Sequence, residues 1–333
     1  MRAFWGALAV LNLCLAAGGL VFASEHSIST HDAVPIVAAF LVQASVYLVP
    51  GFPEVRRRLE QRFSRPWIAF LAVICSLAPY LIYAVPTAVF SWEAFGKLAA
   101  FCSIIGFLFV VAPAEKQRFS WQDAAALLLL GWPHISGVTF FREIYVSPIA
   151  ASVPRLDILG KLMTIALGVT VFLSLRKLEG VGFRLAPSRQ DLAAGLRNYL
   201  LFLPLGVPVA LVVGFAHWDP KPVEGWSYLL ELVGTMLGIY AAVALAEEFA
   251  FRGITQNLLT GSLRRPLVAR LVASILFGLV HLPTGTFPNW RYALVAAVAG
   301  WFYGRAYEES RSIAPAMVAH TLVVVSWRFG FST

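Results

Sequence analysis

The stretch ALAEEFAFRGI, residues 244–254, places two adjacent glutamates and an arginine in a chain that is otherwise almost continuously apolar. Of the 333 residues, 59% are hydrophobic and 13% are charged, and the mean hydropathy is +0.74. Soluble domains carry about 25% charged residues. The composition therefore indicates a membrane protein. The three ionisable groups need a specific explanation, because each charge at the bilayer centre costs about 2.5 to 3.5 kcal/mol.

Apolar runs separated by proline, glycine and charge extend along the whole chain. A helix needs about 20 mostly apolar residues to cross the hydrocarbon core. The sequence thus predicts an all-α, polytopic transmembrane helix bundle. The eleven candidate spans lie near residues 3–23, 34–52, 67–90, 98–113, 122–141, 158–175, 198–216, 227–249, 266–283, 290–304 and 312–327.

The net charge of +8 is distributed unevenly between the predicted loops. Of the 26 Lys and Arg residues, 17 fall in segments on one side of the predicted bundle and 7 on the other. The positive-inside rule then predicts a multi-pass membrane protein with its N-terminus and its arginine-rich loops in the cytoplasm. The first run could be a signal cleaved after Ala23, but its apolar stretch is long and favours an uncleaved span. No nucleic-acid motif is present, so we expect lipid and no nucleic acid as a partner.

A basic segment, residues 176–199, divides the predicted domains. Residues 1–175 form N-terminal transmembrane helices of unknown role, and residues 200–333 form the domain that carries chemistry. The segment itself is predicted to be a cytoplasmic linker. Ser188 followed by Asp191 is typical of a helix N-terminus, and a short interfacial helix is expected after it.

The charges in 244–254 differ in their predicted partners. Glu248 and Arg252 are four residues apart, so they share a helix face and can pair. Glu247 lies on another face and is left without a helical partner. A carboxylate so placed can serve as a general base, with water as its natural substrate.

Two histidines lie in neighbouring apolar segments. His281 ends the segment ILFGLVHLP, and His320 lies within IAPAMVAHTLVVV. Three interpretations are open: a glutamate-activated water assisted by histidine, a metal site of Glu and His, or a polar network that fastens helices together. Two histidines together with EExxxR favour a functional site.

These residues resemble the motifs of a known family. EEFAFR fits EExxxR and FGLVH fits FxxxH of the membrane-embedded type II CAAX prenyl endopeptidases and their bacterial, lysostaphin-resistance-like relatives. The spacing, 34 residues from Glu247 to His281 and 39 more to His320, is also similar. The resemblance is sharp over residues 245–324 and does not reach the first 175 residues.

The resemblance implies an intramembrane endopeptidase acting on a membrane-associated protein or peptide, with or without a prenyl group. Glu247 would be the general base, assisted by His281. Glu248 and Arg252 would form a supporting ion pair, or Arg252 would steady the substrate, and His320 would help to hold the oxyanion. No cofactor is expected.

Two alternatives use the same residues. Zinc held by Glu247, His281 and His320 would make a metalloprotease, although no HExxH is present. A non-catalytic immunity or scaffold protein could keep the protease fold. The second alternative is favoured by Val324, which stands where the third family motif, HxxxN, has its asparagine.

Two further expectations concern the helices around the site. The span assignments place Glu247 and His281 toward opposite ends of their helices. Because residues 227–259 contain no proline, one long helix with Glu247 nearer mid-membrane would resolve this conflict. The aromatic cluster of Trp301, Phe302 and Tyr303 is interpreted as packing rather than as a cavity for a lipid chain.

Overall fold

A computed structural model describes residues 1–135, 137–223 and 225–332. In these ranges the chain is helical, apart from two short strands. The strands β1 (His217–Trp218) and β2 (Phe331–Ser332) form one antiparallel pair. The all-α polytopic architecture is confirmed.

Eight helices in the described ranges are long and apolar enough to cross a membrane. They are Arg2–Glu25, Thr30–Gly51, Arg65–Ala84, Trp92–Val111, Asp157–Leu175, Arg189–Val212, Gly225–Leu263 and Ile313–Gly330.

The predicted count of eleven spans is wrong at three places. The span expected at 122–141 stops at Gly131, because Pro133 cannot continue the hydrogen-bond ladder. The span expected at 266–283 is a helix of only 14 residues. The helix at 290–304 has 21 residues, but its arginines and glutamates make it too polar to count by composition.

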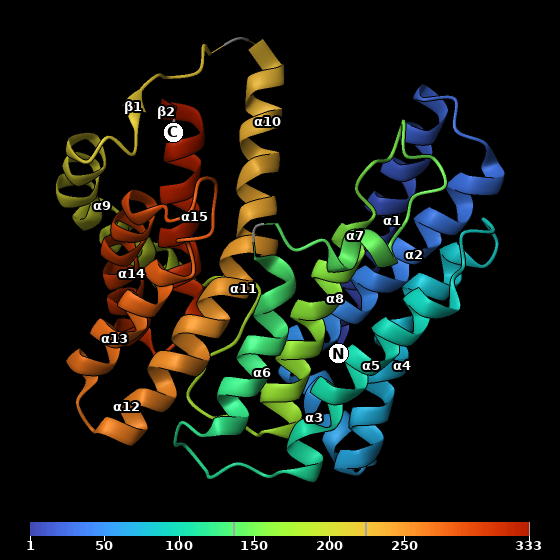
Figure 1. Cartoon of the computed structure of the whole chain (residues 1–333), viewed down its shortest axis with the longest axis horizontal. Helices are drawn as coiled ribbons and strands as arrows, with labels where there is room; N and C mark the ends of the chain where they lie inside the picture. The colour runs from blue at the N-terminus through green and yellow to red at the C-terminus, as the bar shows by residue number, and fades with distance from the viewer. Residues whose placement is uncertain (136, 224, 333) are drawn as a thin grey trace. The chain divides into compact units, whose positions relative to one another are not determined.

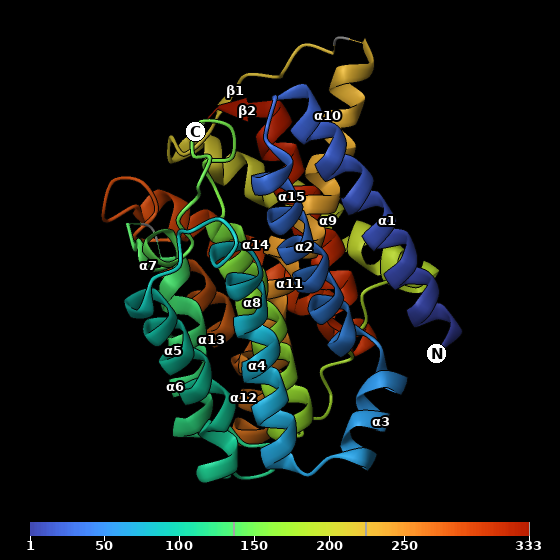
Figure 2. The same ribbon diagram turned by 90° about the vertical axis from the view of Figure 1, so that its right-hand side faces the viewer.

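The chain divides into two compact units. Unit 1 comprises Met1–Ala114 and Ser120–Lys177. Its elements are α1 (Arg2–Glu25), α2 (Thr30–Leu48), η1 (Val49–Gly51), α3 (Pro53–Arg62), α4 (Arg65–Ala84), α5 (Trp92–Val111), α6 (Trp121–Gly131), η2 (Trp132–His134), α7 (Phe140–Ile144), α8 (Asp157–Thr170) and η3 (Val171–Leu175). Helix α2 packs between α1 and α4, and α8 contacts α4 and α5 (Figure 2).

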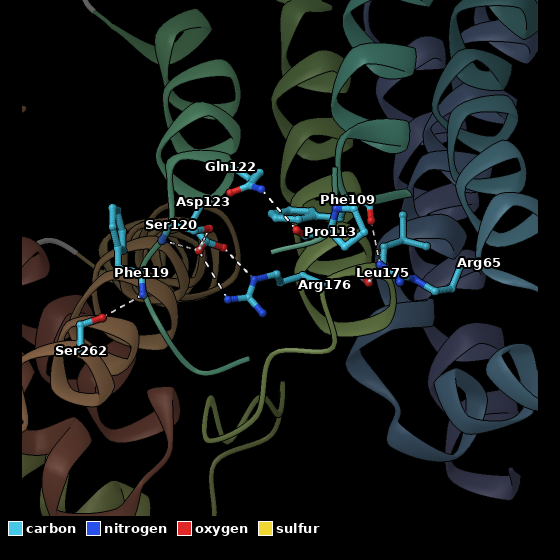
Figure 3. Close-up of polar contacts among 10 residues, drawn as sticks. All are labelled: Arg65, Phe109, Pro113, Phe119, Ser120, Gln122, Asp123, Leu175, Arg176 and Ser262. Atoms are coloured by element: carbon cyan, nitrogen blue, oxygen red, sulfur yellow. Dashed lines mark hydrogen bonds and ion pairs between the residues drawn. The ribbon is translucent and has the colours of Figure 1, made fainter. Parts of the chain in front are cut away.

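Polar contacts fasten the helix ends of unit 1 that carry the basic residues (Figure 3). Arg176 donates through Nε to Oδ1 of Asp123 at 2.9 Å, and both side chains are buried. Arg65 donates to the carbonyls of Phe109 and Leu175 at 2.8 and 2.6 Å. These carbonyls lie at helix C-termini, where no intrahelical donor is available to them. The arginines therefore join α4, α5, α6 and η3 at one end of the unit.

Unit 2 comprises Glu115–Phe119 and Leu178–Thr333. Its elements are α9 (Arg189–Val212), β1, α10 (Gly225–Gly238), η4 (Ile239–Ala244), α11 (Leu245–Glu248), η5 (Phe249–Gln256), α12 (Asn257–Leu263), α13 (Pro266–Leu279), α14 (Trp290–Ser310), α15 (Ile313–Gly330) and β2. Helix α14 packs against α9, α13 and α15.

The N-terminus of α9 is capped as predicted. Ser188 accepts from the backbone N–H of Asp191, and the Asp191 carboxylate accepts from the backbone of Ser188. The prediction of a separate short interfacial helix is wrong, because α9 continues for 24 residues through Pro204 and Pro208. Residues 189–199 of the predicted linker are thus the first three turns of a helix long enough to span.

The segment Gly225–Leu263 is one helix of 39 residues. In Figure 1, α10, α11 and α12 follow one another without a break. Two π-helical stretches, η4 and η5, flank the four residues of α11. Such wide turns commonly lie at functional sites, and here they bracket both glutamates. The long helix expected from the absence of proline is confirmed.

Candidate active site

The ion pair predicted from helical spacing is present. Arg252 donates through Nε to Oε2 of Glu248 at 3.0 Å, and neither side chain is exposed. The guanidinium lies 5.0 Å above the ring of Phe277 and 5.8 Å from that of Tyr303. Its Nη1 and Nη2 have no hydrogen-bond partner among the described residues. Arg252 is therefore held through Nε, and its Nη1 and Nη2 nitrogens are left as donors.

His320 on α15 completes a buried triplet with this pair. Its Nδ1 lies 2.8 Å from Oε1 of Glu248. Because a carboxylate only accepts, Nδ1 donates, and Nε2 of the neutral ring carries the lone pair. The ring stacks on Tyr303 at a centroid distance of 4.8 Å and an angle of 9°. The orientation of His320 is thus fixed by a hydrogen bond and by a stacked ring.

Glu247 lies beside this triplet and differs from it in exposure. Its side chain is 31% exposed, whereas that of Glu248 is fully buried. Its Oε2 lies 3.8 Å from Nε2 of His320 and has no hydrogen-bond partner in the described part of the chain. An acceptor oxygen and an acceptor nitrogen therefore face each other across a gap wider than a hydrogen bond.

His281 lies at the edge of the site. Its Nδ1 donates to the Phe277 carbonyl at 2.7 Å, so Nε2 of the neutral ring is an acceptor. Its ring packs against Phe277 and Tyr292, at 4.9 and 4.6 Å between centroids. The Phe277 ring also lies 5.8 Å from that of His320. The structure thus brings Glu247, Glu248, Arg252 and His320 together, while His281 reaches them through the phenylalanine of its own motif.

Tyr303 is the site residue that sequence reasoning missed, since its cluster was interpreted as packing. It is 2% exposed and touches both His320 and Arg252. A signal was available in the same helix, where Gly300 and Gly304 are one turn apart. A Cβ at Gly300 would lie 3.2 Å from Nη2 of Arg252, and one at Gly304 would lie 2.6 Å from Oε1 of Gln256. Small residues spaced by four mark close helix packing in membranes, and this spacing brings α14 against η5.

The residues beyond His320 bear on the missing asparagine. Val324 is half-buried one turn after His320 on α15. Ser326 bonds to the Tyr199 hydroxyl at 2.7 Å and to the Leu322 carbonyl at 2.8 Å, so it is engaged elsewhere. The Thr321 hydroxyl is buried and has no hydrogen-bond partner within the described ranges.

The donor set bears on the zinc alternative. Catalytic zinc sites use three protein ligands. In the described ranges, no group of three or more His, Cys, Asp or Glu side chains is arranged to hold a metal. Glu247 and His320 face each other, whereas the ring of His281 packs against Phe277 and Tyr292 at the edge of the site. The described residues thus show no preformed three-ligand site, and the zinc alternative stays a prediction.

Residues 229–326 match the family model for type II CAAX prenyl endopeptidase Rce1-like proteins. The matched segment runs from α10 to α15 and contains all five predicted site residues. The resemblance drawn from the motifs is thereby confirmed. The C-terminal part of the chain is thus similar to this family, and the eight long apolar helices are those of a multi-pass membrane protein. No curated protein and no solved structure matches the chain.

Proposed function

We propose that the chain is an intramembrane endopeptidase that hydrolyses a peptide bond of a membrane-associated protein or peptide with a water activated by Glu247. One observation carries the proposal. Oε2 of Glu247, a buried atom on a side chain that is 31% exposed, lies 3.8 Å from Nε2 of His320, while Nδ1 of the same ring is anchored on the buried Glu248–Arg252 pair. A water beside these two acceptors that donates one hydrogen to each would be oriented by both.

The reaction follows from these positions. Glu247 takes a proton from the water as its oxygen attacks the scissile carbonyl, and the carbonyl oxygen becomes an oxyanion. The free Nη1 and Nη2 of Arg252 are the available donors for that oxyanion. As the carbon–nitrogen bond breaks, the proton held by Glu247 passes to the leaving amine. Atoms and charge then balance without a cofactor.

Glu248 is assigned a positioning role. Its Oε2 accepts from Arg252 and its Oε1 accepts from His320, so both oxygens are already engaged. We place the protein in a bacterial inner membrane with its N-terminus in the cytoplasm, as its basic loops favour. The proposed substrate is a membrane-associated protein or peptide, with or without a prenyl group.

The test compares the termini of membrane proteins from hosts that express wild type, Glu247→Gln or Glu231→Gln at matched levels. Glu231 is an exposed glutamate on the same long helix, paired with Lys221 at 2.6 Å, so it controls for loss of a charge. We expect new termini with wild type and Glu231→Gln that are absent with Glu247→Gln. Termini that persist in Glu247→Gln would remove Glu247 as the base.

Two rival functions give different results in the same system. A zinc enzyme would contain stoichiometric metal, and chelation would remove both metal and activity. A non-catalytic scaffold would keep its biological function in Glu247→Gln and show the same termini in all three strains.

A further inference from the structure

An apolar groove lies outside the active site, on unit 2. It is formed by α9, α13 and α14 and has a volume of about 320 Å³. Side chains that line it include Leu205 of α9, Leu271 and Ile275 of α13, and Val298, Trp301 and Phe302 of α14. Two of the three aromatic residues that the sequence analysis assigned to packing therefore line a groove.

Arginines lie in line with this groove at one end of the same helices. On α9, Arg197 precedes Leu201 by one turn and Leu205 by two turns. On α14, Arg305 follows Trp301 by one turn. Residues four apart share a helix face, so the stripes that line the groove end in these two arginines.

The two arginines converge on one carboxylate. Arg197 pairs with Oε2 of Glu309, and Nε of Arg305 lies 3.3 Å from Oε1 of the same group. Asn198 also donates to Oε2 at 3.1 Å. Two positive charges thus share one negative charge, and their side chains remain 58% and 43% exposed. Each guanidinium has five N–H donors, so both have capacity for a second anion.

Charge also borders the groove itself. The guanidinium of Arg270 lies 3.9 Å from the ring centroid of Trp301 and pairs with Glu308 at 2.9 Å. This arginine is already neutralised and stacked, so it stiffens the Trp301 wall. The unmatched positive charge lies with Arg197 and Arg305.

We propose that this surface binds an anionic phospholipid of the bilayer, with one acyl chain in the groove and the phosphate between Arg197 and Arg305. The apolar lining matches a hydrocarbon chain, and the arginine pair supplies the charge that a phosphodiester lacks. A zwitterionic lipid brings its own cation and gains less from the pair. The site is separate from Glu247, and its occupation does not depend on peptide hydrolysis.

The test uses the full chain purified in detergent and incubated with phosphatidylglycerol or with phosphatidylcholine of the same acyl chains. Native mass spectrometry counts the bound lipid. We expect at least about fivefold tighter binding of phosphatidylglycerol, because an arginine near an anionic headgroup contributes about 1 kcal/mol. Equal binding of the two lipids by the wild-type chain would overturn the proposal without any variant.

Variants separate the headgroup from the chain. Arg305→Gln is expected to weaken phosphatidylglycerol about fivefold and to leave phosphatidylcholine unchanged. Arg291→Gln, at the other end of α14, removes the same charge away from the groove and should change neither lipid. Val298→Trp fills the groove and should lower binding of both. Equal losses in Arg305→Gln and Arg291→Gln, or unchanged binding in Val298→Trp, would contradict the site. Glu247→Gln protein should bind as wild type does, so this result is independent of proteolysis.

Discussion

The buried triplet of Glu248, Arg252 and His320 is expected to contribute to the stability of the folded protein, whereas Glu247 is not. Arg252→Met removes the cation and leaves the Glu248 carboxylate buried with a single partner. Breaking a buried pair on one side typically costs about 3 to 5 kcal/mol. We therefore expect a much lower apparent melting temperature in detergent for Arg252→Met. Glu247→Gln, at a half-exposed position, should melt close to wild type, and equal melting of the two variants would refute the supporting role of the pair.

The valine one turn after His320 gives a gain-of-function prediction. Val324→Asn restores an amide donor at the position where the similar family has one. Loss of a single oxyanion donor costs about 100-fold to 1000-fold, so we expect the substitution to raise the cleavage rate, by up to about 100-fold. Val324→Ala, which alters the side chain without adding a donor, is the control. Equal cleavage rates for the two variants would show that the missing amide at position 324 does not limit the reaction.

Helical spacing alone predicted some of the side-chain contacts in the site and could not predict others. Residues four apart on one helix share a face, so the Glu248–Arg252 pair was predictable and is present. The bond from His320 to Glu248 joins residues 72 positions apart and depends on how α15 packs. No local pattern specifies that packing. Tyr303 was missed for the same reason, since its neighbours are set by the approach of α14.

Among the helices, α13 and α14 approach each other closely at Gly278. A Cβ there would lie 2.4 Å from the Ala293 carbonyl oxygen, which belongs to the backbone and cannot rotate away. Gly278→Ala must separate the helices and is expected to cost about 1 to 3 kcal/mol. Gly234→Ala is the matched control, because no atom lies within 4 Å of its Cβ position. That variant should be neutral or stabilising, because alanine favours helix by about 1 kcal/mol over glycine. Melting temperatures in detergent compare the two, and a tolerated Gly278→Ala would contradict the close approach.

Helix existence was more predictable than helix length. Each predicted span overlaps a helix, since apolar runs in lipid must be helical. The predicted helix ends were wrong where a local feature overrode hydropathy, as Pro133 does after α6. They were also wrong where α9 began inside the predicted linker and continued beyond it. The π-helical turns of η4 and η5 escaped entirely, because a wide turn changes the register without changing the composition.

The distribution of arginines predicts the orientation of the whole chain. We expect single cysteines at Arg58 and Arg265 to be labelled from the same side of the membrane, and cysteines at Val153 and Phe287 from the other. The experiment uses a background without Cys14, Cys75 and Cys102, and an impermeant maleimide on intact and opened cells. Labelling of positions 265 and 287 from the same side would contradict the predicted orientation. Helix α13 lies between these two positions and would then not cross the membrane.

For the molecule as a whole, the sequence predicted the class of protein but few of the contacts between distant parts of the chain. Composition established a membrane protein, and the family match covers residues 229–326. Unit 1 has its own buried ion pair, Asp123 and Arg176, and these two residues lie 53 positions apart in the sequence. Asp123 belongs to a capping box with Ser120 at the start of α6, but no sequence motif links it to Arg176.

The separation between Glu247 and the buried triplet has an evolutionary consequence. The triplet joins α11, η5 and α15 by hydrogen bonds, whereas Oε2 of Glu247 has no hydrogen-bond partner in the described part of the chain, so we expect its replacement to leave the fold intact. A descendant chain could therefore abandon hydrolysis by a single replacement and survive as a receptor or a decoy. Relatives that retain the second glutamate of the doublet but not the first would be the signature of that history.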